Sequence, residues 1–471
     1  MRAGEHTTRL FRDTAPKLRR EEEQTWDASA LMDHQAAELM QFWASNAPGS
    51  GAPECLMAGA LQSLENKGFV LGDYGPLLGR GLAAARTGDI EALLRIDMQL
   101  RALMRDARPD PNHASQATTR YADWASFAAC IDWPTDQAVE AAILPDRIRA
   151  GWLAQLVGAA AGTALEGYSS AQIQTAFGAV TGYLRAPNTF NDDITFEIAF
   201  LEAYLDHGPT LTSRDIAANW VGMVPLGWSA EGVALDNLRR GIMPPHSGCQ
   251  NNPFDEWIGA QMRGAICGMV VPGRAKEAAR LAWMDAEISH AGNGILGEVF
   301  NAVLCALAFS SDDLRNLLCR CIAVIPETTE YGAVIRHALA VCRTAPDWRT
   351  AWAVCDERYH EYNWIHSYPN AAAQVIALWF GEDDFNLTLE ILCGLGHDVD
   401  CNAAQVLCVI GLRKGGGVID ARWSDPLLAG DIVTYMRRPK TLSFNSLVGR
   451  TLEAIQKGAT SQRFGTLLAS G

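Results

Sequence analysis

From about residue 137 to residue 412, one apolar segment after another carries its hydrophobic residues at helical spacing, and alternating β-type patterns are few. The segments are 148–162, 196–205, 216–221, 263–269, 275–286, 296–309, 314–325, 348–359, 371–380 and 404–412. The first is rich in glycine and alanine, which lets a neighbouring helix approach closely, and the last is followed by three glycines, a helix stop signal. Such segments bury their apolar faces by packing helix on helix. We therefore predict an all-α helical bundle with functional loops at the helix ends.

A second helical region precedes this bundle. Helical periodicity runs from about residue 28 to residue 105, and no cluster of chemically reactive side chains stands out there. The polar, proline-bearing segment 106–115 reads as a boundary, and 133–136 as a shorter connector. A chain of 471 residues also exceeds the size of one ordinary core. We predict an N-terminal helical extension over 1–136, which covers the main domain, and a catalytic domain over 137–471.

The overall charge narrows the choice of partners. With 39 basic and 54 acidic residues the net charge is −15, which disfavours nucleic acid as a partner because nucleic-acid binding needs a basic face. We find no uninterrupted apolar run of about eighteen residues and no apolar leader, so we expect a cytoplasmic protein with no membrane partner. The twelve cysteines lie mostly in apolar helical patterns and are expected to be free thiols.

Two polar runs, 188–195 and 396–403, carry paired aspartates directly before apolar helices. Asn191 is a natural N-cap for Asp192 and Asp193, and Asp398 and Asp400 repeat the arrangement. Capping alone would account for one pair, at no more than about 1 kcal/mol, but it explains two such entrances poorly. Unpaired carboxylates are costly to bury, whereas Mg²⁺ prefers oxygen ligands. We predict that the two runs meet around divalent metal, and two Mg²⁺ ions would neutralise the four charges.

Five segments resemble motifs of the ADP-ribosylglycohydrolase superfamily, which includes the dinitrogenase reductase-activating glycohydrolases. The segments follow one another in the same order as the motifs do in that family. They are the glycine-rich stretch 158–166, Asn191-Asp192-Asp193 for the family's Thr/Ser-Asp-Asp, Gly259-Ala260-Gln261-Met262-Arg263 for Gly-Ala-Ala-Met-Arg, Ser289-His290 for Ser/Thr-His, and 396–401 for Gly-x-Asp-x-Asp-Thr. The matches span about 150–415. The resemblance implies an all-α ADP-ribosylglycohydrolase-like fold and two Mg²⁺ ions held by the four aspartates.

The resemblance also implies roles for the residues around the aspartates. Asn191 and Cys401 take the positions of two metal-flanking Thr or Ser residues, and a thiol is a poor ligand for a hard cation, so one of the two metal positions is expected to be weaker or partly filled by water. Glu166 matches an acidic residue that gates the metal centre or handles protons in the family. With Asp193 and Asp400 it forms the expected catalytic set.

Candidate substrate contacts follow from the same motifs and from neighbouring polar residues. They are Gly259, Gln261, His290, Asn293 and His366. For His290 the alternative, a core histidine satisfied by the backbone, is equally open. Trp257-Ile258 replaces the family's Gly-Asn pair, which helps to bind the diphosphate in relatives, and this change bears on the recognition of ADP-ribose.

The leading functional hypothesis is a Mg²⁺-dependent glycohydrolase that cleaves an N- or O-ribosyl bond. Its substrate is an ADP-ribosyl or related ribosyl compound; a small molecule is favoured, and an ADP-ribosylated protein is the alternative. A catalytically silent protein that binds ADP-ribose or a nucleotide is a second hypothesis, motivated by Asn191, Cys401 and Ala159, which stands where relatives carry aspartate. A metal phosphohydrolase is a third. The released product and the effect of chelation distinguish the three.

Overall fold

The computed structural model describes residues 2–23, 26–309 and 313–469, with side chains up to residue 459. Within these ranges the chain is mostly helical, and its strands form only two-residue antiparallel pairs. The predicted all-α fold is confirmed. No helix in the described part of the chain is long and apolar enough to cross a membrane. All twelve cysteines are free thiols, as expected.

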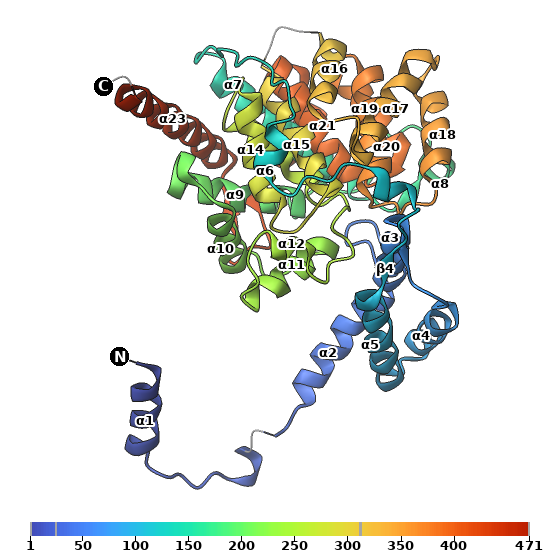
Figure 1. The fold of residues 1–471 in the computed structure, drawn as a ribbon. Helices are drawn as coiled ribbons and strands as arrows, with labels where there is room; N and C mark the ends of the chain where they lie inside the picture. Colours follow the sequence, from blue (N-terminus) through green and yellow to red (C-terminus); the bar gives the residue numbers. More distant parts are fainter. Residues whose placement is uncertain (1, 24–25, 310–312, 470–471) are drawn as a thin grey trace.

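The N-terminal part of the chain forms a small unit beside the main body (Figure 1). Helices α2 to α5 enclose a separate apolar core that includes Trp43, Leu61, Leu93 and Leu100, whereas α1 buries no residue and stands apart. Strand β1 pairs with β2, and β3 with β4. The elements are α1 (Ala3–Asp13), a 3₁₀ turn η1 (Glu21–Glu23), α2 (Ser29–Trp43), β1 (Ser45–Asn46), β2 (Pro53–Glu54), α3 (Leu56–Asn66), β3 (Phe69–Val70), α4 (Gly75–Thr87), α5 (Ile90–Asp106) and β4 (Arg108–Pro109).

The main body is a bundle around one large apolar core. Phe127 already belongs to this core, with its ring 5.2 Å from that of Trp283, so the chain joins the main body before residue 136. The elements up to the second acidic run are η2 (Ala114–Ala117), α6 (Trp124–Ala128), α7 (Leu144–Gly162), β5 (Tyr168–Ser169), α8 (Ser170–Phe177), α9 (Asp192–His207), η3 (Gly208–Thr210), α10 (Ser213–Met223), α11 (Ser229–Arg239), α12 (His246–Cys249), η4 (Gln261–Arg263), α13 (Gly264–Met269), α14 (Ala275–Ala286), α15 (Asn293–Leu307), α16 (Leu314–Val324), α17 (Glu330–Thr344), α18 (Trp348–Tyr359), α19 (Ser367–Gly381) and α20 (Phe385–Leu395).

The C-terminal part supplies the helix at the centre of the bundle and a hairpin. Its elements are β6 (Gly396–His397), α21 (Val399–Lys414), η5 (Gly416–Val418), α22 (Ala421–Leu428), β7 (Ile432–Val433), β8 (Thr441–Leu442) and α23 (Phe444–Ala469). Helix α21 lies in the middle of the bundle in Figure 1, and α23 projects from its edge. Helix α21 is buried from Val399 to Leu412 and packs along α7, which is itself buried over most of its length.

Candidate metal centre

Glycines bring α7 and α21 into backbone contact. A Cβ on Gly158 would collide with the backbone of Ala403, and a Cβ on Gly162 with the backbone of Asp400. Beyond the end of α7, β5 pairs with β6, and the amide of Gly167 donates to the carbonyl of His397 at 2.9 Å. This packing places the loop that carries Glu166 directly beside the turn that carries Asp398 and Asp400.

The second acidic run forms a compact set of potential ligands. Ligand atoms of Asp398, Asp400 and Cys401 all lie within 4.8 Å of one another, and the three residues are buried. Asn370 supports the turn, because its Oδ1 accepts hydrogen bonds from the Asp398 amide at 3.2 Å and from Asn402 Nδ2 at 2.7 Å. The turn is therefore held in place by neighbouring residues whether or not a metal is bound.

The first acidic run forms the entrance of α9. Asn191 is the N-cap, as expected, and its Oδ1 accepts a hydrogen bond from the Ile194 amide at 3.4 Å. Asp192 is partly exposed, and Asp193 is fully buried. The cap leaves one lone pair of the Asn191 amide oxygen for another partner.

The electrostatics of these groups show that the two runs meet. Burial raises the pKa of Asp193 well above its ordinary value, and nearby Asp400, Asp192 and Asp398 raise it further. Burial also raises the pKa of Asp400 to about 6, with Asp192 adding to the effect. The pKa of Glu166 is raised well above its usual range by burial and then by Asp400, Asp398 and Asp192. Five carboxyl groups thus share one region of low dielectric, where like charges repel strongly.

The donor set fits a divalent cation. Both carboxylate oxygens of Asp193, and one each of Asp398 and Asp400, are buried and accept no hydrogen bond from an N–H or O–H group among the described residues. Buried oxygens of this kind are costly unless a cation or a proton compensates them. Cys401 fits less well: burial and the surrounding aspartates raise the pKa of its thiol, which keeps it neutral. Oxygen ligands therefore dominate the site, as hard cations prefer.

The five residues expected to contact substrate lie in the interior. Gln261 accepts a hydrogen bond from Tyr331 Oη at 2.8 Å, and Asn293 donates to Glu256 at 3.0 Å. Nδ1 of His366 accepts the amide of Tyr368 at 3.2 Å. The exposed fractions are 0% for Gln261, 1% for Asn293 and 2% for His366. Their role as substrate contacts stays a prediction, and the contacts described here position the surrounding backbone.

Gly259 and His290 are connected through hydrogen bonds of the buried Arg263. Arg263 Nη1 donates to the carbonyl of Gly259 at 2.6 Å, and Nη2 donates to Ser289 Oγ at 2.9 Å. That hydroxyl lies 2.7 Å from His290 Nδ1, while His290 Nε2 accepts the Ala260 amide at 3.3 Å. Burial and Arg263 lower the pKa of His290 well below its usual range, so the imidazole is neutral. The alternative of a core histidine satisfied by its neighbours matches this geometry.

Arg263 also gathers three acids. It is 1% exposed and forms ion pairs with Glu231 at 2.7 Å, with Asp285, and with Glu298 at 3.6 Å. The pKa of Glu231 is raised to about 7. Burial is the main cause, and the nearby charge of Asp192 raises it further. Arg263 and its three acidic partners therefore lie next to the acidic cluster.

Two neighbours of the cluster carry no recognisable sequence signal. Tyr435, between β7 and β8, has its pKa raised by burial and then by Asp192 and Glu231. Gly49, in the extension, lies against the Glu166 loop: a Cβ there would collide with Thr163 and come within 3.0 Å of Glu166 Oε2. Neither residue belongs to a motif, so only the fold could reveal it.

Comparison with known families decides the identity of the main body. The family model for ADP-ribosylglycohydrolase matches residues 140–456. The chain belongs to the ADP-ribosylglycohydrolase family. Among solved structures, one described as an ADP-ribosylglycohydrolase-related protein complex is similar over 67% of this chain and 99% of its own, with 17% sequence identity and a TM-score of 0.49. No curated protein matches.

Membership of the ADP-ribosylglycohydrolase family makes the protein a hydrolase of glycosidic bonds. The family acts on ADP-ribosyl substrates and typically binds divalent metal ions, and the acidic set described above is a possible site for them. The match begins at residue 140, so the unit formed by α1 to α5 lies outside the family model.

Proposed function

We propose that this ADP-ribosylglycohydrolase is a Mg²⁺-dependent enzyme that cleaves an N- or O-ribosyl bond of a small ADP-ribosyl or ribosyl compound. The observation that carries the proposal is the set of buried oxygens on Asp193, Asp398 and Asp400 that accept no N–H or O–H hydrogen bond within the described chain. Two ions are proposed, held by Asp192, Asp193, Asp398 and Asp400, with Asn191 and Cys401 at the flanks. When bound, they supply positive charge and Lewis acidity to the attacking water.

The chain's own residues divide the remaining work. Glu166 is partly exposed beside the aspartates, and burial together with Asp400, Asp398 and Asp192 raises its pKa above the usual range of a carboxyl group, as is common for carboxyl groups that transfer protons. We assign it to removing the proton from the attacking water. Asp193 and Asp400 stabilise the positive charge that develops at the anomeric carbon as the ribosyl bond breaks.

A hairpin of the extension supports the choice of a small substrate. The turn between β1 and β2 lies on Glu166, and Arg185 Nη1 donates to the Gly49 carbonyl at 2.7 Å. On the other side, Trp364 Nε1 donates to Glu54 Oε2 at 2.6 Å. A wall held at both ends restricts the approach of a folded protein to Glu166 more than the approach of a small molecule.

The proposal is tested by turnover of a panel of ribosylated compounds with product analysis. We expect release of ribose or ADP-ribose, loss of turnover after chelation, and recovery when Mg²⁺ is restored. Asp193→Ala should remove metal binding and activity together while the protein stays folded by circular dichroism. Glu166→Gln should lower kcat by about 10²- to 10⁴-fold, the range of general acid–base catalysis. Release of inorganic phosphate, or wild-type turnover by Asp193→Ala, would contradict the proposal.

The neutral thiol of Cys401 in a ligand position favours one alternative, a protein that binds ADP-ribose without hydrolysing it. Equal binding of ADP-ribose with and without Mg²⁺, and no product from any compound of the panel, would establish that alternative.

A further inference from the structure

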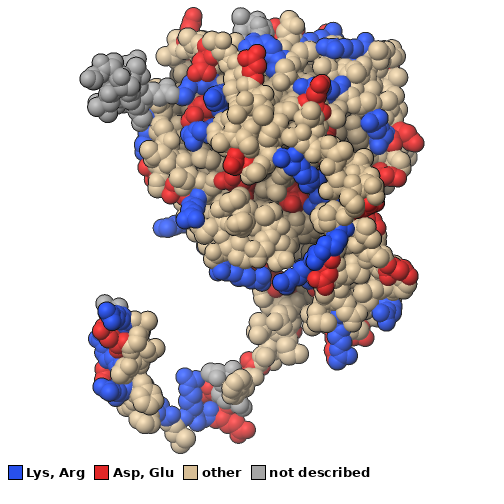
Figure 2. Space-filling model, viewed as in Figure 1, with Lys and Arg blue, Asp and Glu red and all other residues tan. Residues whose placement is uncertain are grey.

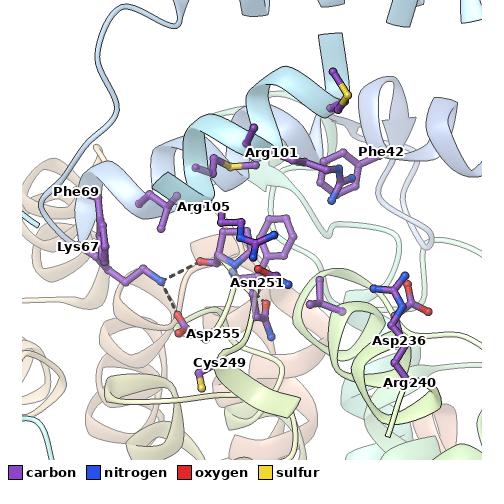
Figure 3. A pocket seen from close by; sticks show the side chains of 18 residues that line it. Phe42, Lys67, Phe69, Arg101, Arg105, Asp236, Arg240, Cys249, Asn251 and Asp255 are labelled. Atoms are coloured by element: carbon purple, nitrogen blue, oxygen red, sulfur yellow. Dashed lines mark hydrogen bonds and ion pairs between the residues drawn. The ribbon is translucent and has the colours of Figure 1, made fainter. Parts of the chain in front are cut away.

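A cleft of about 840 Å³ lies between the N-terminal unit and the main body (Figure 3). Helix α5 and the residues around β3 form one wall, and the end of α11 and the segment 249–255 form the other. No aspartate of the acidic cluster lines this cleft, which we call the seam cleft. Its volume lies within the range of small-molecule sites in proteins.

The seam cleft is basic although the protein is acidic. Its charged lining consists of Lys67, Arg101, Arg105 and Arg240 against Asp236 and Asp255. In Figure 2, lysine and arginine side chains gather along the boundary between the main body and the smaller unit. In a chain of net charge −15, a basic cleft attracts anions from solution.

Two of these four basic side chains form no ion pair within the described residues, so their charge is available to bind an anion. Lys67 forms a 2.6 Å ion pair with Asp255, and Arg101 forms a 2.6 Å ion pair with Asp97. Arg105 and Arg240 are exposed, and neither forms an ion pair with a residue in the described part of the chain. Figure 3 shows Arg105 reaching down from α5 towards Asn251, while Arg240 comes from the opposite wall. Two guanidinium groups from opposite walls are a suitable arrangement for binding phosphate oxygens.

The same cleft offers apolar and aromatic surface. Phe69 is half-buried at one end, and Met98 is 62% exposed at the rim. Phe42 lies under the guanidinium of Arg101, with 4.4 Å between Cζ and the ring centre. Asn251 adopts a left-handed backbone conformation with φ of 55° and presents a side-chain amide to the cleft. Aromatic surface beside cations and an amide suits a planar base attached to phosphates.

From this combination we propose that the seam cleft is a binding site for a nucleoside diphosphate, separate from the metal centre. Arg105 and Arg240 hold the phosphates, and the apolar part of the lining contacts the base. One wall comes from the N-terminal unit, which lies outside the family match. A ligand that contacts both walls also stabilises the packing of the N-terminal unit against the main body, because binding favours the arrangement that contains the site. The proposal does not depend on the substrate of the metal centre.

The test is calorimetric titration of the full-length protein with ADP, in Mg²⁺ buffer and again after chelation. We expect binding that persists after chelation, because the seam cleft uses arginines and no metal. Arg105→Ala combined with Arg240→Ala should weaken it at least tenfold. Arg80→Ala combined with Arg86→Ala is the matched control: it removes two exposed charges from α4, which do not line the cleft, and should leave the affinity unchanged.

Pyrophosphate and adenosine, titrated separately, test the class of ligand. The proposal requires ADP to bind more tightly than either. It is overturned if ADP binds only in the presence of Mg²⁺, if both double variants weaken binding equally, or if pyrophosphate alone binds as tightly as ADP.

Discussion

Replacing Asp400 by asparagine should stabilise the metal-free protein while abolishing its response to metal. Burial and Asp192 raise the pKa of Asp400 from 3.8 to about 6, and the side chain is 4% exposed. Since one pKa unit corresponds to about 1.4 kcal/mol, the ionised carboxylate destabilises the metal-free fold by about 3 kcal/mol at pH 7. An amide of nearly the same shape carries no such penalty.

The sign of this effect depends on pH. A carboxyl group whose pKa is raised on folding costs almost nothing below about pH 3, where it is protonated in both states, and nearly its full cost is present above about pH 6. In the metal-free protein, Asp400→Asn should therefore match the wild type near pH 3 and exceed its free energy of unfolding by about 3 kcal/mol at pH 7. With an unfolding entropy of roughly 2.1 cal/mol/K per residue, that gain raises the Tm by about 3 °C for a chain of 471 residues.

Thermal unfolding in EDTA and in Mg²⁺ measures both effects. Mg²⁺ at one hundred times its Kd should add about 2.7 kcal/mol to the wild type and nothing to the variant. Asp431→Asn is the control, because Asp431 is exposed and its replacement removes the same charge. If wild type and Asp400→Asn unfold at the same temperature in EDTA at pH 7, the reasoning about crowded carboxylates is refuted.

Three further predictions concern the support of the centre. Arg263→Leu should lower the free energy of unfolding by about 3–5 kcal/mol, because it leaves three buried acids without their cation; denaturant titration measures this, and a loss under 1 kcal/mol would contradict it. Cys401→Thr should tighten Mg²⁺ binding in a calorimetric titration, since a hydroxyl oxygen replaces a neutral thiol, and weaker binding would count against a ligand role. Gly158→Val should abolish soluble folded protein, because the side chain would collide with the backbone of Ala403; a folded variant with normal activity would show that the two helices can separate.

The sequence predicted the class of fold because long buried helices leave a clear periodic pattern. It missed several helices, among them α17 and α20. In α17 a glycine at the third position suggests a turn, although Val334, Ile335, Ala338 and Leu339 are buried at helical spacing. In α20 the stretch Phe385–Leu395 alternates apolar and polar residues at its start, which favours a strand by local criteria. Tertiary packing decides both segments.

For the site, the sequence identified the two acidic runs and Glu166, and the structure brings all of them into one region. Their roles as metal ligands and catalytic residues remain predictions. The contributions of Gly49 and Tyr435 could not be found from sequence, because they depend on a hairpin of the extension and on a hairpin after α22. The expected substrate contacts Gln261, Asn293 and His366 are buried, and their role stays a prediction.

The pairing of β5 with β6 divides the acidic cluster into two mechanical parts. Glu166, Asp398 and Asp400 lie on loops that a two-residue ladder and the contact between α7 and α21 join to each other. Asp192 and Asp193 arrive separately, on a helix preceded by the irregular stretch 178–191. The spacing between the two halves of the cluster therefore depends on how the buried helix α9 packs in the bundle, since Asp193 to Leu201 are buried there.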